Sequence, residues 1–117
     1  MSVPTTVSFV VPTYNSARTI GACLQSLVSQ TWPHVEVVVV DNDSKDDTWE
    51  ISRRWTPHVE NRGPERCAQR NHGAAVSTGD IVVFVDSDMV FEPTIAAEIV
   101  EQFQAHPELG ALVIPER

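Results

Sequence analysis

The chain has 117 residues, a length that suits one domain of ordinary size. Hydrophobic residues make up 42% of it and charged residues 21%, a composition that argues for a folded globular protein and against disorder. Sixteen acidic against eight basic residues give a net charge of −8, which argues against nucleic acid as a partner because phosphate backbones require a basic face.

The sequence carries no signal for a membrane or for export. No apolar run reaches the roughly 18 residues that a membrane-spanning helix requires, and the N-terminus lacks the basic and apolar regions of a signal peptide. The two cysteines, Cys23 and Cys67, have no CxxC spacing. They are interpreted as buried thiols in a reducing compartment, with a disulfide left open. We therefore expect a cytoplasmic protein.

The first part of the chain predicts a strand followed by a helix. The β-branched run at residues 7–11 predicts a strand that Pro12 stops. Asn15 and Ser16 are side chains that cap helix N-termini. The apolar residues at 20–28 recur at helical spacing, so they predict an amphipathic helix with its apolar stripe in the core.

A second strand and a second helix follow. Residues 35–40 are apolar at nearly every position, which is typical of a parallel-sheet strand buried on both faces. Ser44 and Asp47 fit a capping box at the start of a helix that Pro57 ends. A short strand is expected at 58–60.

The remaining elements continue the alternation. Residues 66–77 predict a helix in which Gly73 is a weak point, and the apolar run at 81–85 predicts a strand buried on both faces. Pro93 suits the first position of a last helix. A further strand is expected at 112–114.

Alternating strands and helices predict an α/β fold. We expect a mainly parallel, Rossmann-like sheet with right-handed crossovers and helices on both faces, which makes three layers, αβα. Ligands of such sheets bind beyond the carboxyl ends of the strands. The segments to inspect are therefore 12–15, 41–44 and 86–88.

Carboxylates gather at these strand ends. Asp41 and Asp43 follow the second strand, and Asp86 and Asp88 follow the strand at 81–85. Four acids on one edge repel each other, so we expect a cation to neutralise them. In extended chain, Asp86 and Asp88 would share one face, and such oxygen ligands suit Mg²⁺ or Mn²⁺. The alternative is that these acids are ordinary turn and capping residues.

Three other side chains are candidates for contact with a ligand. Asp41 is placed to accept a hydrogen bond from an imide N–H, such as that of a pyrimidine, and Tyr14 to stack beside that base. Arg70 is a charge partner for the acids or for a diphosphate. Each also has a plain structural reading, as a loop acid, a half-buried aromatic and a solvated helix arginine. His72 is interpreted as structural.

Motifs of several other enzyme classes are missing from the sequence. It contains no GxxxxGK[ST], GxGxxG, HExxH or GxSxG. A phospho-acceptor receiver is also disfavoured, because Lys45 is the only lysine and no lysine follows a late strand.

Four blocks of sequence occur in a fixed order along nearly the whole chain. The blocks are VVPTYN at 10–15 with CLQSL at 23–27 and QTWP at 30–33, VVDNDS at 39–44 with DDT at 46–48, RNHG at 70–73 with STGD at 77–80, and VDSD at 85–88. Together they resemble family 2 glycosyltransferases with the GT-A fold, in which the last block is the DxD motif.

The resemblance implies a nucleotide-sugar donor site, with a UDP-sugar foremost, and a metal-dependent, inverting transfer to an acceptor. The metal implied is Mn²⁺ or Mg²⁺, with Asp88 as its direct ligand and Asp86 in its shell. The residues that the resemblance places at the nucleotide sugar are Pro12, Thr13, Tyr14, Asn15, Asp41, Arg70 and Asp86.

The general base and the acceptor site belong, in the related enzymes, to the second half of the domain. Residues 1–117 are therefore interpreted as a single donor-binding half that stops before that second half, and no catalytic base is nominated. Surface left uncovered predicts a homodimer. Peripheral membrane association of a longer protein is also compatible with the family.

Two alternatives stay open. A nucleotidyltransferase of similar topology would need a basic loop after the first strand, where the sequence offers only Arg18. A non-catalytic module for nucleotide binding or assembly would need no general base.

Overall fold

The computed structural model describes residues 5–106. The strands are β1 (Val7–Thr13), β2 (Val35–Asp41), β3 (Val59–Asn61) and β4 (Ile81–Phe84). The helices are α1 (Ile20–Val28), α2 (Thr48–Trp55), α3 (Arg66–Val76) and α4 (Ile95–Ala105).

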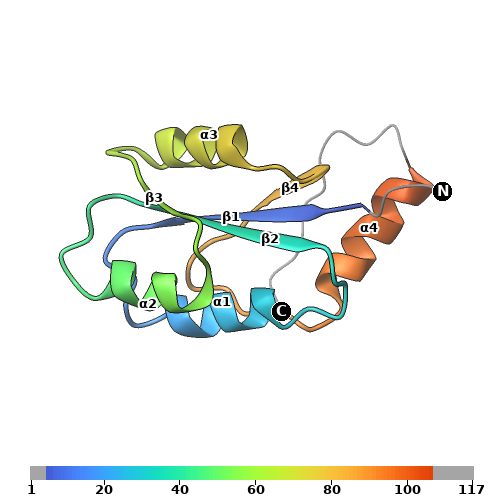
Figure 1. Ribbon diagram of the computed structural model, residues 1–117, viewed down its shortest axis with the longest axis horizontal. Coiled ribbons are helices and arrows are strands. Elements are labelled where there is room, and N and C mark those ends of the chain that lie inside the picture. The colour runs from blue at the N-terminus through green and yellow to red at the C-terminus, as the bar shows by residue number, and fades with distance from the viewer. Residues whose placement is uncertain (1–4, 107–117) are drawn as a thin grey trace.

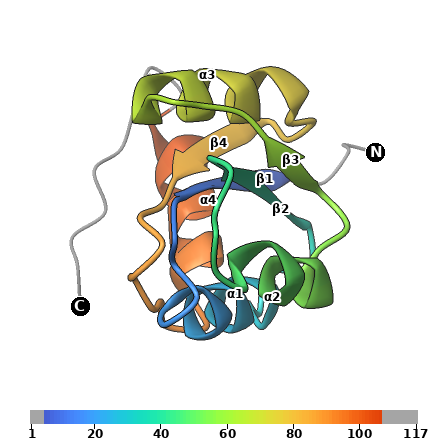
Figure 2. The ribbon, with the colours of Figure 1, turned by 90° about the vertical axis from the view of Figure 1, so that its left-hand side faces the viewer.

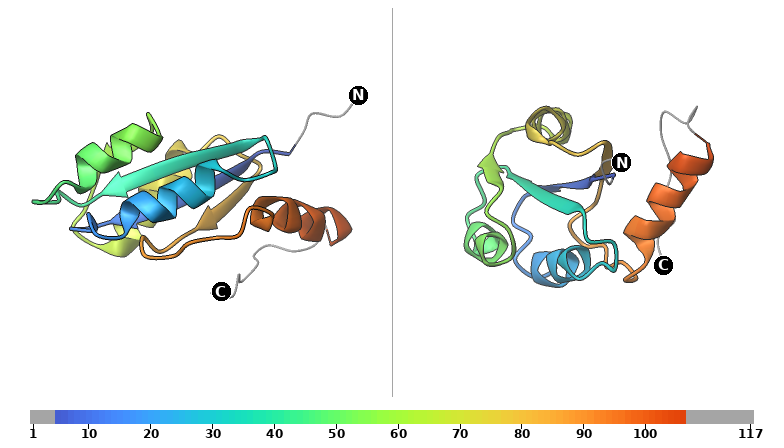
Figure 3. Two further views of the ribbon diagram at one scale, coloured as in Figure 1. Left: turned by 90° about the horizontal axis from the view of Figure 1, so that it is seen from below. Right: turned by 45° about the vertical axis from the view of Figure 1, so that its right-hand side comes forward.

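The strands form one parallel sheet in the order β3-β2-β1-β4. Helix α3 covers one face, and α1, α2 and α4 lie on the other (Figures 1 and 2). Helices α1 and α2 run side by side, whereas α4 stands apart from them (Figure 3). The three-layer α/β architecture expected from the alternating elements is confirmed.

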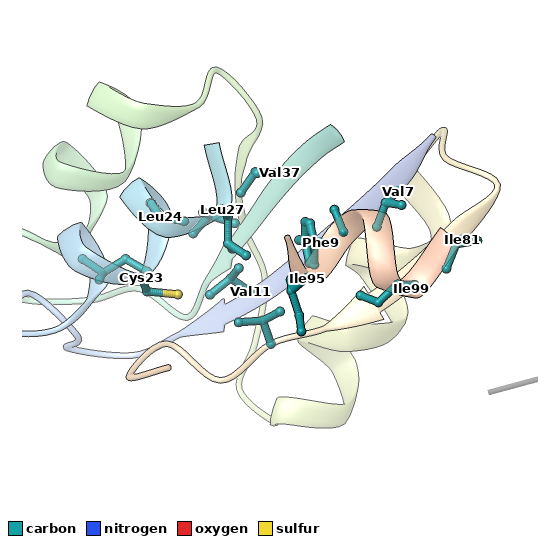
Figure 4. Packing of buried hydrophobic residues seen from close by; sticks show 14 of the residues in the cluster. Val7, Phe9, Val11, Cys23, Leu24, Leu27, Val37, Ile81, Ile95 and Ile99 are labelled. Atoms are coloured by element: carbon teal, nitrogen blue, oxygen red, sulfur yellow. The ribbon is translucent and has the colours of Figure 1, made fainter. Parts of the chain in front are cut away.

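The sheet separates two apolar layers, because successive side chains of a strand point to opposite faces. Phe9 and Val11 of β1 lie in the larger layer with residues of α1 and α4, all of them buried (Figure 4). Val10, Val38 and Val40 form the smaller layer under α3. The valine run of β2 is therefore buried on both faces, as predicted.

Gly73 lets α3 lie close to the sheet. A Cβ added at this position would lie 2.3 Å from Cγ1 of Val10 and 3.2 Å from Cγ2 of Val40. The residue that the sequence indicates as a weak point of the helix is thus the place where the helix backbone meets the smaller apolar layer.

Strand β1 does not stop at Pro12, as the sequence predicts, but continues to Thr13. The carbonyl of Val10 accepts a hydrogen bond from the N–H of Val85, so the backbone N–H and C=O groups of the even-numbered residues of β1 point towards β4. Pairing with β4 ends at Val10. The backbone nitrogen of Pro12 therefore points to the β4 side, where no strand pairs with this part of β1. The missing N–H of proline costs no hydrogen bond, and the bonds between β1 and β2 are unaffected.

Strand β4 is not buried on both faces, so that prediction is wrong. Val82 is 37% exposed and Phe84 is 48% exposed. Among the described residues β4 pairs only with β1, and α3 packs mainly over β1 and β2. One face of β4 is consequently open, and so is its outer edge as far as residues 5–106 are concerned.

The predicted start of α1 is wrong. The helix begins at Ile20 with Thr19 as its N-cap. Asn15 has a positive φ of 49°, and the carbonyl of Ser16 accepts hydrogen bonds from the N–H groups of Thr19 and Ile20. Asn15 and Ser16 thus form a turn between β1 and the helix.

The capping box predicted for α2 is also wrong. The N-cap is Asp47, whose side chain makes no capping hydrogen bond, and the N–H of Thr48 donates instead to Asp46. The Ser44 hydroxyl donates to Asp41, so it is not available to the helix.

The other boundaries differ by a residue or two. Strand β3 begins at Val59 and α3 ends at Val76. Pro93 precedes Thr94, the N-cap of α4, and does not occupy the first helical position. The strand expected at 112–114 lies outside the described residues.

Both cysteines are free, but only Cys23 is buried. Cys67 is exposed on α3, so the interpretation of two buried thiols is wrong for it. Val28 is 43% exposed at the end of α1, which leaves it outside the buried stripe of that helix. No helix within residues 5–106 is both long enough and apolar enough to cross a bilayer.

Candidate functional site

The loops that follow β1, β2 and β4 are joined by hydrogen bonds beyond the carboxyl ends of these strands. The N–H of Asn15 donates to Oγ of Ser44 over 2.8 Å, and the N–H of Ser16 donates to Oγ1 of Thr48 over 2.7 Å. The Ser87 hydroxyl donates to the Ser16 hydroxyl over 3.1 Å. The edge predicted to bind a ligand therefore exists as one connected surface.

Asp41 lies at the base of this surface and is only 2% exposed. Its Oδ1 accepts hydrogen bonds from the hydroxyls of Thr13 and Ser44, each over 2.6 Å. Its Oδ2 accepts one from the N–H of Ser44 over 3.0 Å. The carboxylate thus joins the ends of β1 and β2, and its contact with a base stays a prediction.

Gln69 was not identified from the sequence. This residue of α3 is 4% exposed, and its Nε2 donates to the carbonyls of Thr13 and Val40 over 2.9 and 2.7 Å. It lies one turn before Gly73, on the helix face that meets the sheet. The sequence carries no signal for this role, because it depends on which side of α3 faces the sheet.

The segment 12–15, predicted to line a ligand, is divided by the structure. Pro12 and Thr13 are buried in β1, and the Thr13 hydroxyl points to Asp41. Tyr14 is 61% exposed and Asn15 is also exposed. The first two residues therefore support the loop from within, and the last two present side chains at its surface.

Two arginines of α3 converge on Asp86. Nη1 of Arg66 lies 3.3 Å from Oδ1 of Asp86, and Nη2 of Arg70 lies 3.8 Å from the same oxygen. Arg66 was not identified from the sequence, although its spacing of four residues from Arg70 places both on one side of the helix. The pair makes this side of the site basic.

Arg70 is not a fully solvated helix arginine. Its side chain is 39% exposed, and its Cζ lies 5.9 Å from the centre of the Phe84 ring. Its Nε is buried and has no hydrogen-bond partner within residues 5–106. The guanidinium is thus packed against β4 while its Nη2 faces Asp86.

Asp86 and Asp88 lie on a turn rather than in extended chain, because the N–H of Met89 donates to the carbonyl of Asp86 over 3.1 Å. The expectation that both carboxylates share the face of an extended segment is therefore wrong. Asp88 is exposed, and its carboxylate forms no hydrogen bond or ion pair with another described residue.

Cys23 lies beneath this turn. Its Sγ donates a weak hydrogen bond to the carbonyl of Asp86 over 3.8 Å. Burial, followed by the charges of Asp88 and Asp86, raises the pKa of the thiol to about 12. The thiol is therefore neutral at physiological pH and supports the turn as a small apolar group.

We expected a cation to neutralise the four acids, and three of them have partners within the protein itself. Asp41 is satisfied by hydroxyls and an N–H, Asp86 faces two arginines, and Asp43 pairs with Lys45 over 2.9 Å. No group of three or more His, Cys, Asp or Glu side chains suited to a metal occurs in the described part of the chain.

The carboxylates at 86–88 still fit a metal ion that takes most of its ligands from water and from a bound phosphate. Mg²⁺ is usually held by one or two carboxylates and completes its shell with water and phosphate oxygens. Asp88 offers an unpartnered carboxylate, and Oδ2 of Asp86 is outside both arginine contacts.

Comparison with known proteins gives a consistent set of similarities. The sequence model of glycosyl transferase family 2 matches residues 8–117. Glycosyltransferase AglE of Haloferax volcanii is 40% identical over 91 residues, which cover 70% of this chain and 30% of AglE.

Two solved structures are similar over most of the chain. The mannosyltransferase PcManGT from Pyrobaculum calidifontis, in complex with GDP-Man and Mn²⁺, has a TM-score of 0.84 and 32% identity, covering 99% of this chain and 37% of its own. Glucosyl-3-phosphoglycerate synthase from Mycobacterium tuberculosis, in complex with Mg²⁺ and UDP, has a TM-score of 0.74 and 28% identity, covering 85% and 39%. The chain therefore spans about a third of the length of these relatives.

Proposed function

Since the chain belongs to glycosyl transferase family 2, we propose that it forms the donor site of an enzyme that transfers a sugar from a nucleoside diphosphate to an acceptor hydroxyl. The observation that carries the proposal is the connected edge beyond β1, β2 and β4, where two arginines contact Asp86 and the open carboxylate of Asp88 follows on the same turn. Guanidinium groups suit phosphate oxygens, and carboxylates suit a divalent cation.

The nucleoside is proposed to lie over the loop after β1. Tyr14 and Asn15 present exposed side chains there, and Tyr14 offers a ring for stacking on a base. Oδ2 of Asp41 accepts a single hydrogen bond, which leaves acceptor capacity for an imide N–H. Pro12 and Thr13 hold the loop in place. A uracil base is our first choice, and the GDP-Man complex of one relative makes guanine the second.

The diphosphate is proposed to lie between the arginines of α3 and the turn at 86–88. Arg66 and Arg70 would balance the charge that develops on the leaving diphosphate. Asp88, with Asp86, would hold Mn²⁺ or Mg²⁺, which acts as a Lewis acid when bound. Solved relatives contain each of these metals.

The acceptor site and the general base are proposed to lie outside residues 1–117, and we assign no base in this chain. The chain spans about a third of its relatives, which leaves room for both elsewhere in a protein of that length. An inverting transfer needs such a base to deprotonate the acceptor hydroxyl.

The free thiols of Cys23 and Cys67 support a cytoplasmic location.

The test is calorimetric titration of the 117-residue chain with UDP, GDP, UDP-GlcNAc and GDP-Man, with and without Mn²⁺. We expect at least one to bind, and Mn²⁺ to strengthen binding by roughly tenfold or more. Asp88→Asn should remove most of that gain. Glu101→Gln, the same loss of charge at an exposed position of α4, should leave it intact.

The absence of binding to all four nucleotides, with metal or without, would contradict the donor site. If Asp88→Asn and Glu101→Gln change the Mn²⁺-dependent gain in affinity equally, Asp88 is not a metal ligand. UTP is titrated in the same way, and a clear preference for UTP over UDP would favour a nucleotidyltransferase instead.

A further inference from the structure

The carboxylate of Asp86 is held by both arginines through the same oxygen. Arg66 and Arg70 contact Oδ1 at 3.3 and 3.8 Å, and the three side chains are between 39% and 58% exposed. Exposed ion pairs of this kind are weak, because water and salt screen them. They can therefore be exchanged for a stronger partner at little cost.

The two arginines differ in how firmly they are held. Arg70 packs against the Phe84 ring, and its Nε is buried. Arg66 is the first residue of α3, is 58% exposed, and makes no ring contact within the described residues. Arg66 can therefore move by rotation of its own side chain, whereas Arg70 must leave a packed position to do so.

Arginine contacts have opposite consequences for the two ligands of the proposed site. A guanidinium beside Asp86 repels a divalent cation from that carboxylate. The same guanidinium attracts the oxygens of a diphosphate, which it can contact through two N–H groups at once.

We propose that Arg66 is an exchange residue. In the donor-free chain it holds Asp86, and when a nucleoside diphosphate binds it moves to the diphosphate and leaves Asp86 free for the metal. This inference rests on the proposed donor site and adds a residue that the family motifs quoted above do not contain. It makes metal and nucleotide bind cooperatively, because each is favoured by the same movement of Arg66.

The test measures Mn²⁺ and UDP affinity separately in the 117-residue chain and in Arg66→Ala. Free Mn²⁺ is followed by electron paramagnetic resonance without nucleotide, and UDP binding is followed by calorimetry in EDTA. We expect Arg66→Ala to bind Mn²⁺ about two- to fivefold more tightly and UDP about two- to fivefold more weakly. A residue that merely stabilised the turn would weaken both affinities.

Two further variants complete the design. Arg66→Lys keeps a cation and should retain Mn²⁺ affinity close to that of the original chain. Arg54→Ala removes an exposed arginine of α2 and should change neither affinity. If UDP proves too weak for calorimetry in EDTA, GDP is titrated in the same way.

The outcomes separate this inference from the proposed function. The donor site stands if the unaltered chain binds UDP or GDP with Mn²⁺. The exchange is wrong if, in that case, Arg66→Ala changes neither the Mn²⁺ affinity nor the nucleotide affinity. It is also wrong if Arg66→Ala changes only one of the two, or both in the same direction. If the unaltered chain binds none of UDP, GDP, UDP-GlcNAc and GDP-Man, with Mn²⁺ or without, the donor site itself fails.

Discussion

Glu36 illustrates how a single side chain can be tested far from the site. Burial raises the pKa of its carboxyl, but hydrogen bonds from the Thr78 N–H, the Ser8 hydroxyl and the Thr78 hydroxyl outweigh it, so the pKa is lowered below its ordinary value of 4.5. A lowered pKa means that the charged form stabilises the fold. This stability is present above the unfolded pKa and is lost as pH falls through the folded one.

We therefore expect Glu36→Gln to lower the free energy of unfolding by about 1 kcal/mol at neutral pH and to flatten the loss of stability below pH 4.5. Urea denaturation at a series of pH values measures both effects. Glu101→Gln, at an exposed position, should leave the profile unchanged. A pH profile of Glu36→Gln that parallels the original would contradict the role of this carboxylate.

At this scale the sequence predicted positions better than partners. Asp86 and Asp88 were correctly placed after the strand at 81–85, because an apolar run followed by polar residues marks a strand end. The contacts of Arg66 and Gln69 were missed, because they depend on which side of α3 faces the sheet. That rotation is set by the backbone contact at Gly73, which only the packed structure reveals.

Helix α3 offers the sharpest test at the scale of elements. Alanine normally stabilises a helix by about 1 kcal/mol relative to glycine. In Gly73→Ala, however, the new methyl would overlap Cγ1 of Val10, and we expect a net loss of about 1–3 kcal/mol. In Gly21→Ala of α1, the new Cβ would lie 3.7 Å from Cγ2 of Ile51, an ordinary contact, so this change should be neutral or stabilising.

Urea denaturation of both variants checks this expectation. Gly73→Ala combined with Val10→Ala should cost less than the sum of the two single changes, because the second change removes the overlapping methyl groups. Stabilisation by Gly73→Ala alone would show that α3 does not rest on Val10.

The order and type of the elements were predictable because the apolar runs of β1, β2 and β4 and the helical spacing of apolar residues in α1 are clear in the sequence. The helix starts were not, because capping side chains have competing partners. Asn15 and Ser44 hydrogen-bond to each other across two loops, and Ser44 also donates to Asp41. The first bond joins residues 29 apart in sequence, and the second uses the hydroxyl that the capping box would need, so a local capping rule anticipates neither.

At the scale of the whole molecule, the open side of β4 is the feature that predicts association. Val82 and Phe84 are exposed on an edge strand that pairs only with β1 among the described residues. Such edges favour pairing with another chain. We expect the 117-residue chain to self-associate as its concentration rises, and Val82→Lys to shift it towards monomer in sedimentation velocity.

Val28→Lys is the matched control, since Val28 is 43% exposed on α1 at a different surface. Equal effects of the two substitutions would indicate that general charge, rather than the β4 edge, controls association. A monomer at all concentrations in the unaltered chain would remove the basis for the homodimer prediction.

The amide of Gln69 has a consequence for how the site responds to a ligand. By bonding to Thr13 and Val40 it fastens the ends of β1 and β2 to α3. The strand ends beneath the site are then held rigidly, and only the loops after the strands can change conformation when a ligand binds. A nucleotide would therefore order a short stretch of backbone only, and slow amide hydrogen exchange would extend unbroken from the middle of the sheet to its carboxyl edge.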